Sequence, residues 1–264
     1  MLIAADNLTA SRPSVARAIQ KRDAEFLARL CRQVEEAGAH WLDLNPGYVA
    51  ASQKREVWKF LIKTAEKACG LKLMLDAPRA EDLETGLLFC KRPPILNMAT
   101  AEESRLDPLL ELAQKNGLTL VASTMTGQVP QDAEGRLALA ALIAERARQK
   151  GITGQRLVLD PMVMPLGLPQ GEAHAAGVLG FLRSLDSVIE PRPLTMIALS
   201  NLTTKTAGVK TDFAAPSFLA AAAGAGLDVV MMDALDRELV RVVRLCKVFK
   251  GQVVFAQGEF DSQT

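Results

Sequence analysis

Acidic and amide side chains close most of the apolar runs of this sequence. The polar residues at these run ends are Asp6 and Asn7, Asp43 and Asn45, Asp76, Asn97, Ser123 and Thr124, Asp160, Ser200 and Asn201, and Asp233. A carboxylate can accept two parallel hydrogen bonds from neighbouring N–H groups, and an amide offers one donor and one acceptor in a plane. If the run ends meet in space, the set could recognise a flat polar heterocycle. A pterin, a purine or another cyclic amide would each satisfy that requirement.

Helix capping is the simpler explanation for any single member of this set, because Asp and Asn are common where a strand gives way to a helix. It is weaker for Asp76, Asp160 and Asn201, which follow long apolar runs directly. Pro161 also biases Asp160 toward an extended backbone and away from helix initiation. We therefore expect these three residues to serve a site.

Short apolar runs alternate with amphipathic stretches along the whole sequence. We expect strands at 1–6, 40–45, 71–76, 93–99, 118–125, 156–164, 194–201 and 228–235. We expect helices at 14–37, 54–69, 80–90, 102–116, 131–150, 172–189, 215–225 and 236–249. Apolar strands joined by helical crossovers predict a parallel sheet covered on both faces, and roughly 250 residues suit one closed α/β barrel, a (β/α)8 TIM barrel. The prediction is a single domain over 1–264, with 255–264 as a tail, and its run ends gather at one mouth.

The composition narrows the possible functions. A net charge of +1 gives no basic field for a nucleic-acid partner, and no apolar window is long enough for a membrane span. The start MLIAAD lacks a basic region and is typical of a strand, not of a signal peptide. Four scattered cysteines favour a reduced, cytoplasmic protein. With only His40 and His174 and no CxxC pair, we expect no protein-bound metal.

Segments spread in collinear order over nearly the whole chain resemble the pterin-binding methyltransferase family, in particular the methyltetrahydrofolate:corrinoid protein methyltransferases. They are RAIQKRD (17–23), EEAGAHWLDLNPG (35–47), LMLDAPRAEDLETGL (73–87), ILNMATAEE (95–103), TMTGQVPQD (124–132), LVLDPMVMP (157–165), ALSNLTT (198–204) and FLAAAAGAGLDVVMMDALD (218–236). The resemblance implies a TIM barrel and a homodimer. It also implies methyl transfer between 5-methyltetrahydrofolate and the cobalt of a corrinoid (cobalamin) carried by a partner protein.

The same resemblance assigns roles to individual residues. It places Asp76, Asn97 and Asp160 on the pterin ring, Asp43 and Asn45 at the floor of the site, and Asn7 and Ser200 among the pterin-binding residues. Asn201 would approach nitrogen 5, the atom that carries the methyl group. An amide there can donate most strongly as charge develops on that nitrogen, which stabilises the transition state. A cobalt nucleophile on a separate protein fits a chain without an evident nucleophilic cysteine or triad.

Two segments depart from the family pattern. The first strand ends Ala5-Asp6-Asn7-Leu8-Thr9, where the family commonly has a Gly-Glu-Arg-Ile-Asn-like segment. The loop after Asn201 carries Lys205 and Lys210 instead of an arginine-containing pattern. We therefore expect the contacts with the folate tail and the corrinoid partner to differ from those of the family.

Other functions fit parts of the same pattern. A dihydropteroate synthase-like enzyme would share the fold and the pterin site, but it needs cations for a pyrophosphate leaving group, and the last two predicted strands end ALSN and MMDAL without them. A non-catalytic folate-binding or corrinoid-docking protein would not need Asn201. A barrel enzyme acting on another heterocycle is a third alternative.

Overall fold

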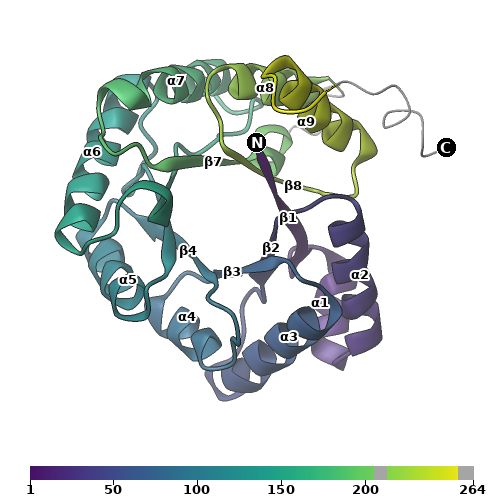
Figure 1. Ribbon diagram of the computed structural model, residues 1–264. Coiled ribbons are helices and arrows are strands. Elements are labelled where there is room, and N and C mark those ends of the chain that lie inside the picture. The colour runs from purple at the N-terminus through teal and green to yellow at the C-terminus, as the bar shows by residue number, and fades with distance from the viewer. Residues whose placement is uncertain (205–212, 255–264) are drawn as a thin grey trace.

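Eight apolar strands pair edge to edge in chain order in the computed structural model, and the last strand closes onto the first (Figure 1). They are β1 (Leu2–Thr9), β2 (Trp41–Asn45), β3 (Lys72–Asp76), β4 (Ile95–Thr100), β5 (Thr119–Ser123), β6 (Leu157–Asp160), β7 (Leu194–Ala198) and β8 (Val229–Met232). Every pairing is parallel. The structure describes residues 1–204 and 213–254, and over these it confirms the predicted (β/α)8 barrel.

Amphipathic helices surround the barrel. They are α1 (Pro13–Lys21), α2 (Ala24–Glu36), α3 (Lys54–Ala68), α4 (Ala80–Leu87), α5 (Glu103–Asn116), α6 (Ala133–Gln149), α7 (Gly171–Ser184), α8 (Ala214–Gly224) and α9 (Arg237–Phe249). Single 3-10 turns form η1 (Ala51–Gln53), η2 (Gly154–Arg156) and η3 (Leu185–Ser187), and η4 spans Leu199–Thr203. Each helix packs its apolar face on the sheet, as Val57, Leu61 and Ile62 of α3 do. Burial of each such side chain contributes about 1.5–3 kcal/mol relative to exposure.

A separate apolar core fills the inside of the barrel, and it determines where the polar layer lies. Its buried members are Ala4, Trp41, Met74, Ile95, Val121, Val158, Met196 and Val229, one from each strand. Side chains alternate between the two faces of a strand, so the residue two positions later returns to the interior. On β1 to β6 those later residues are Asp6, Asp43, Asp76, Asn97, Ser123 and Asp160. The sequence therefore places a polar layer directly above this apolar core.

The long helix predicted at 14–37 is wrong as a single helix. Arg22 adopts a left-handed backbone with φ of 55°, which ends α1. Asp23 then caps α2, because its side chain accepts a hydrogen bond from the backbone N–H of Phe26 at 3.0 Å.

Several predicted strands are too long at their C-terminal ends. β6 ends at Asp160, because Pro161 has no N–H to continue the ladder. β7 ends at Ala198, so Ser200 and Asn201 lie in η4 and not on the strand. β8 ends at Met232. β1 runs on to Thr9 instead, past the predicted end at residue 6.

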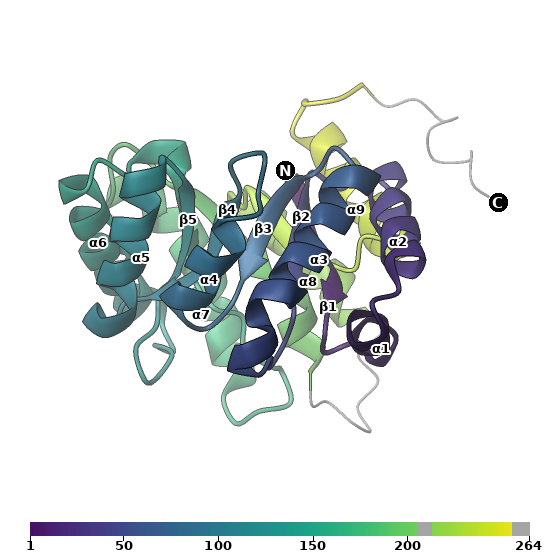
Figure 2. The same ribbon diagram turned by 90° about the horizontal axis from the view of Figure 1, so that it is seen from below.

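All the strands point to one face of the molecule. Figure 2 shows β1 and β3 with their arrowheads toward the lower face, where α1 also lies, and the N-terminus toward the opposite face. The run ends therefore meet at a single mouth, as the barrel geometry requires. Among the helices of residues 1–204 and 213–254, none is both long and apolar enough to cross a membrane.

Candidate active site

Two β-bulges occur at strand positions that carry predicted site residues. On β1, Asp6 and Asn7 together oppose Asp43 of β2, because Ala5 pairs with Leu42 and Leu8 with Leu44. On β4, Asn97 and Met98 lie between the pairs Leu96–Leu120 and Ala99–Ala122. A bulge inserts an extra residue and redirects side chains, so each one breaks the strict alternation at the barrel mouth.

The floor of the mouth is a hydrogen-bonded set of acids and amides. Asn45 Nδ2 donates to Asp76 Oδ2 at 2.8 Å, and Asn45 Oδ1 accepts from the backbone N–H of Gly47 at 2.9 Å. Asn97 Nδ2 lies 3.5 Å from Asp43 Oδ1. Asn97 Oδ1 is buried and accepts no hydrogen bond from any described residue. A buried acceptor without a donor is costly. We therefore expect this oxygen to accept a hydrogen bond from an N–H group of a ligand.

Asp160 is held on the opposite side of the mouth, at the end of β6. Its carboxylate accepts a 2.8 Å hydrogen bond from the backbone N–H of Met162, and Ser123 Oγ lies 3.5 Å from its other oxygen. Asp160 and Ser123 are both buried. Thr124 is also buried, but its hydroxyl donates to the Asp160 backbone carbonyl, so it serves the strand and not the cavity. The Asp160 carboxylate is thereby fixed in one orientation.

Burial raises the pKa of the floor carboxylates. The pKa of Asp43 is raised well above 3.8 by burial and by the neighbouring charges of Asp76 and Asp6. Burial raises the pKa of Asp76 to about 6, although the hydrogen bond from Asn45 opposes the shift. Burial also raises the pKa of Asp160 to about 6. A ligand that donates N–H groups would stabilise the charged forms of these acids.

An arginine that the strand-end pattern missed links two acids at the rim. Arg12 donates to Asp6 Oδ1 and to Asp233 Oδ2, each at 2.9 Å. Asn7 donates to Asp233 Oδ1 at 2.6 Å and accepts from the backbone N–H of Ala234. Arg12 is the N-cap residue of α1, directly before Pro13. A proline at the first helical position marks a helix start, and this signal could have placed Arg12 at the mouth.

Asn201 and Ser200 lie in η4, directly beyond the end of β7. Asn201 is half-buried, and its side chain makes no hydrogen bond to any described residue. Ser200 is exposed and lies close enough to Asp6 to help lower that carboxyl's pKa, which burial nevertheless raises overall. The expected residues Lys205 and Lys210 lie outside the described residues.

A second arginine that the strand-end pattern missed binds the backbone directly after Asp160. Arg136 of α6 is fully buried and donates to the backbone carbonyls of Pro161, Gln131 and Asp132 at 2.6–3.0 Å. Its remaining nitrogen lies 3.2 Å from Nδ1 of His174, which agrees with a hydrogen-bonded histidine rather than an acid–base catalyst. Burial lowers the pKa of Arg136 to about 10, and it stays cationic at neutral pH.

The ion pairs of Arg12 lead to a first prediction. Arg12→Gln should lower the melting temperature at pH 7, because Asp6 and Asp233 lose their shared cation and Asp6 is buried. The loss should shrink as the pH falls toward 4, because burial raises the pKa of Asp6 and this carboxyl then becomes protonated. Although burial opposes the shift, the pKa of Asp233 is lowered by its hydrogen bonds from Asn7 and Arg12, so its share of the loss should persist at pH 4. Arg17→Gln, at an exposed position of the same helix, is the control for thermal melts at pH 7 and pH 4. An equal loss at both pH values would contradict the electrostatic role.

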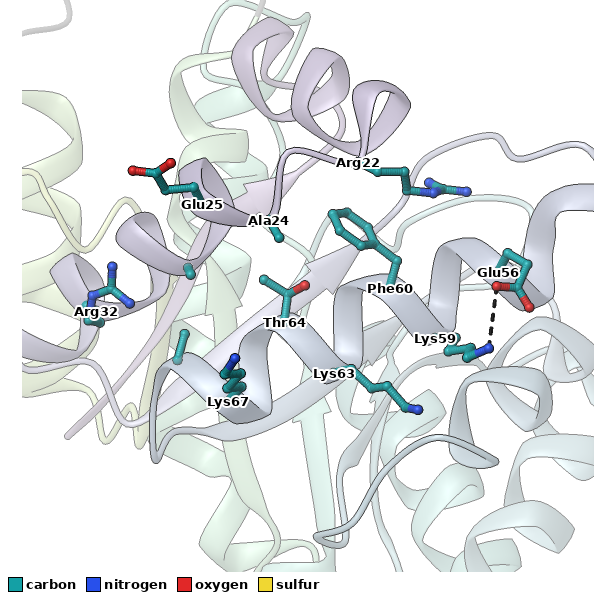
Figure 3. Close-up of a pocket in the computed structure, with 12 residues that line it drawn as sticks. Arg22, Ala24, Glu25, Arg32, Glu56, Lys59, Phe60, Lys63, Thr64 and Lys67 are labelled. Carbon is teal, nitrogen blue, oxygen red and sulfur yellow. Dashed lines mark ion pairs between the residues drawn. The ribbon is translucent and has the colours of Figure 1, made fainter.

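A separate groove on the outside of the barrel is not part of this site. It has a volume of about 780 Å³ and lies between α2 and α3. Lys59, Lys63 and Lys67 line one side of it, and Arg22 lies 5.3 Å from the centre of the Phe60 ring (Figure 3). Its lining comes from α2, α3 and Arg22, and it includes none of the acids and amides of the mouth.

Within the described part of the chain, no group of three or more His, Cys, Asp or Glu side chains is arranged to hold a metal ion. The sequence pattern of pterin binding enzymes matches residues 6–233, which begin and end at the two acids that Arg12 bridges. The chain belongs to the pterin binding enzyme family.

One curated relative of this pterin binding enzyme matches it along its whole length. The methylcorrinoid:tetrahydrofolate methyltransferase of Eubacterium limosum is 27% identical over 98% of this chain and 97% of its own. Solved structures with the same fold include dihydropteroate synthases. That of Yersinia pestis, in complex with a sulfonamide drug, has a TM-score of 0.68 at 16% identity and covers 96% of this chain and 94% of its own. The dihydropteroate synthase of Vibrio fischeri has a TM-score of 0.65 at 15% identity, and the match covers 95% of this chain and 93% of its own. At such low identities these structures show the shared fold alone.

Proposed function

We propose that this chain transfers a methyl group between 5-methyltetrahydrofolate and the cobalt of a corrinoid carried by a partner protein. The observation that carries the proposal is the set of buried acceptors in the mouth of a pterin binding enzyme, above all the unpartnered Asn97 Oδ1. Such acceptors match a ligand that presents several N–H groups along one edge.

The pyrimidine ring of a pterin has that edge. Its exocyclic amino group and the adjacent ring N–H can donate two parallel bonds to one carboxylate, and Asp160 offers a fixed, buried one. The Asn97 amide can accept through Oδ1 from another ring N–H. Asp76 keeps lone pairs for the ligand, because Asn45 occupies only one of its oxygens. In this proposal Asn45 and Asp43 position the acceptors, and Asn7 and Ser200 complete the rim.

Asn201 supplies the hydrogen bond that methyl transfer requires. When the reduced cobalt attacks the methyl carbon, the bond from that carbon to nitrogen 5 breaks, and its electron pair stays on the nitrogen. Nitrogen 5 must then gain a proton from solvent, and the Asn201 amide N–H stabilises the developing charge until it does. The Asn201 side chain is not committed to another described residue and is free to turn toward the substrate.

The comparison with the Eubacterium limosum enzyme supports the choice of methyl group and acceptor. Its name describes transfer from a methylcorrinoid to tetrahydrofolate, and it covers nearly the whole of this chain. The same groups serve both directions, since the forward and reverse reactions share one transition state. A corrinoid protein as partner is part of this proposal, whereas a homodimer and a cytoplasmic location remain predictions from the sequence.

A dihydropteroate synthase-like reaction is less compatible with the mouth. It would need cations to stabilise a pyrophosphate leaving group. Arg12 is engaged by two acids, and Arg136 is engaged by backbone carbonyls. The other described residues of the mouth named above are acids, amides and hydroxyls.

The decisive experiment is to mix the protein with 5-methyltetrahydrofolate and free cob(I)alamin under anaerobic conditions. We expect protein-dependent loss of the cob(I)alamin spectrum and formation of methylcobalamin and tetrahydrofolate. Calorimetry of 5-methyltetrahydrofolate alone supplies the binding control. Tight binding without any methyl transfer would favour the non-catalytic alternative. Formation of dihydropteroate from a dihydropterin pyrophosphate and aminobenzoate would favour the synthase.

A further inference from the structure

A pocket of about 360 Å³ lies beside the floor of the mouth, between the loops that follow β2 and β3. We call it the side pocket. It is lined by Pro46–Val49, Ala51, Lys54 and Trp58 on one side and by Ala77–Arg79 and Asp82 on the other. Both loops follow the C-terminal ends of barrel strands, so the side pocket opens on the same face as the acceptor set.

The side pocket is continuous with the proposed pterin site through the backbone. Its loops begin one residue after Asn45 and Asp76, the pair joined by a 2.8 Å hydrogen bond. The N–H of Gly47 donates to Asn45 Oδ1, and the N–H of Ala77 donates to the carbonyl of Asn97 at 3.1 Å. A substituent on a heterocycle held by these residues therefore has an adjoining cavity to enter.

The lining of the side pocket combines aromatic and charged side chains. Of its two aromatic residues, Tyr48 is fully exposed and Trp58 is buried. Lys54 donates to Asp82 Oδ1 at 2.5 Å, and Arg79 Nε lies 3.3 Å from Asp82 Oδ2. These two cations and one acid are the only charged residues in its lining, all of which is described, and they leave a net charge of +1.

The Arg79 guanidinium keeps capacity for a second anion. Its side chain is 61% exposed, whereas the Asp82 side chain that it contacts is only 12% exposed. Its contacts with Asp82 are long, at 3.3 and 3.5 Å, and involve Nε and one terminal nitrogen. The other terminal nitrogen has no described partner and is available to a carboxylate.

We infer that the side pocket binds the aminobenzoyl-glutamate arm of the folate substrate, with its aryl ring against Tyr48 and its glutamate carboxylates on Arg79. The inference rests on the proposed function, because it supposes that a pterin occupies the neighbouring acceptors. A stiff aryl amide that ends in carboxylates needs both an apolar surface and a positive charge, and the lining of the side pocket contains both. In this inference the tail contacts come from the loops that follow β2 and β3.

The test compares two ligands on four proteins. Calorimetry should measure the affinities of 5-methyltetrahydrofolate and of a tail-less 5-methyl-tetrahydropterin for the wild type, Tyr48→Ala, Arg79→Ala and the control Lys63→Ala. Lys63 is exposed on α3, the helix that also carries Lys54, but it lies outside the side pocket. Arg79→Ala and Tyr48→Ala should each weaken 5-methyltetrahydrofolate about fivefold, the scale of a partly exposed contact. Neither should change the affinity for the tail-less pterin, and Lys63→Ala should change neither affinity.

The outcomes separate this inference from the proposed function. If the wild type binds the tail-less pterin but the variants lose nothing with the full folate, the side-pocket inference is overturned and the proposed function stands. If the wild type binds neither ligand, the proposed function itself fails. If both variants bind folate normally but transfer methyl slowly to a corrinoid protein, the side pocket contacts the partner instead, and the inference is again overturned.

Discussion

Asn201→Ala should slow methyl transfer to cob(I)alamin by about tenfold or more, the scale of a lost transition-state donor, while the affinity for 5-methyltetrahydrofolate changes little. The reason lies in when the hydrogen bond matters. Nitrogen 5 of the methylated substrate is a weak acceptor, and it becomes a strong one only as the bond to the methyl carbon breaks. An interaction that strengthens along the reaction lowers the rate constant when it is removed and leaves ground-state binding largely intact.

Single-turnover kinetics with the protein in excess measure the transfer step, and calorimetry measures the affinity. Asn201→Asp is the sharper variant, because a carboxylate of the same shape accepts hydrogen bonds but donates none when ionised. Asn116→Ala is the matched control, since that amide bonds only the carbonyl of Leu112 at the end of α5. Wild-type transfer rates in both position-201 variants would remove Asn201 from the mechanism.

The barrel was predictable from the sequence because strand and helix periodicities recur without a break. The polar layer was predictable too, since Asp43, Asp76 and Asp160 each follow an interior residue of the apolar core by two positions. The same reasoning explains why β7 and β8 contribute no polar side chain to this layer. Their corresponding residues are Ala198 and Met231, which carry no hydrogen-bonding side chain.

Other parts of the site depend on backbone geometry that periodicity does not encode. The bulge on β1 places both Asp6 and Asn7 opposite Asp43, whereas alternation alone would bury only one of them on this side. Asn201 lies in η4 because β7 ends earlier than its apolar run. Arg12 reaches the mouth from a helix start, a position that a search of strand ends does not examine. Which residues serve as positioning groups was therefore harder to foresee than which residues are acceptors.

Asp160→Asn should weaken 5-methyltetrahydrofolate binding by roughly tenfold to a hundredfold, the range for a charged hydrogen bond with a partner left unmatched. The carboxylate accepts from Met162 and still has lone pairs for two ligand N–H groups, whereas the amide turns one oxygen into a donor. Calorimetry at pH 7.5 measures the loss, and Asp107→Asn, which removes only a surface pair with Arg146, is the control. Unchanged affinity in Asp160→Asn would exclude this residue from the pterin edge.

The same substitution should stabilise the empty protein, which distinguishes a binding residue from a structural one. Burial raises the folded-state pKa of Asp160 from 3.8 to about 6, so the ionised acid destabilises the fold at neutral pH. At 1.36 kcal/mol per pKa unit the penalty is at most about 3 kcal/mol, partly offset in the variant by its new amide donor. The penalty is complete above about pH 6, falls as the pH drops toward 3.8, and is absent below that. Asp160→Asn should therefore melt at a higher temperature than the wild type at pH 8 and at the same temperature near pH 3.5. A residue that served only the fold would show the opposite result on substitution, with lower stability and unchanged binding.

Folate affinity of the wild type should fall as the pH drops through 6, since the protonated acid no longer accepts two N–H bonds.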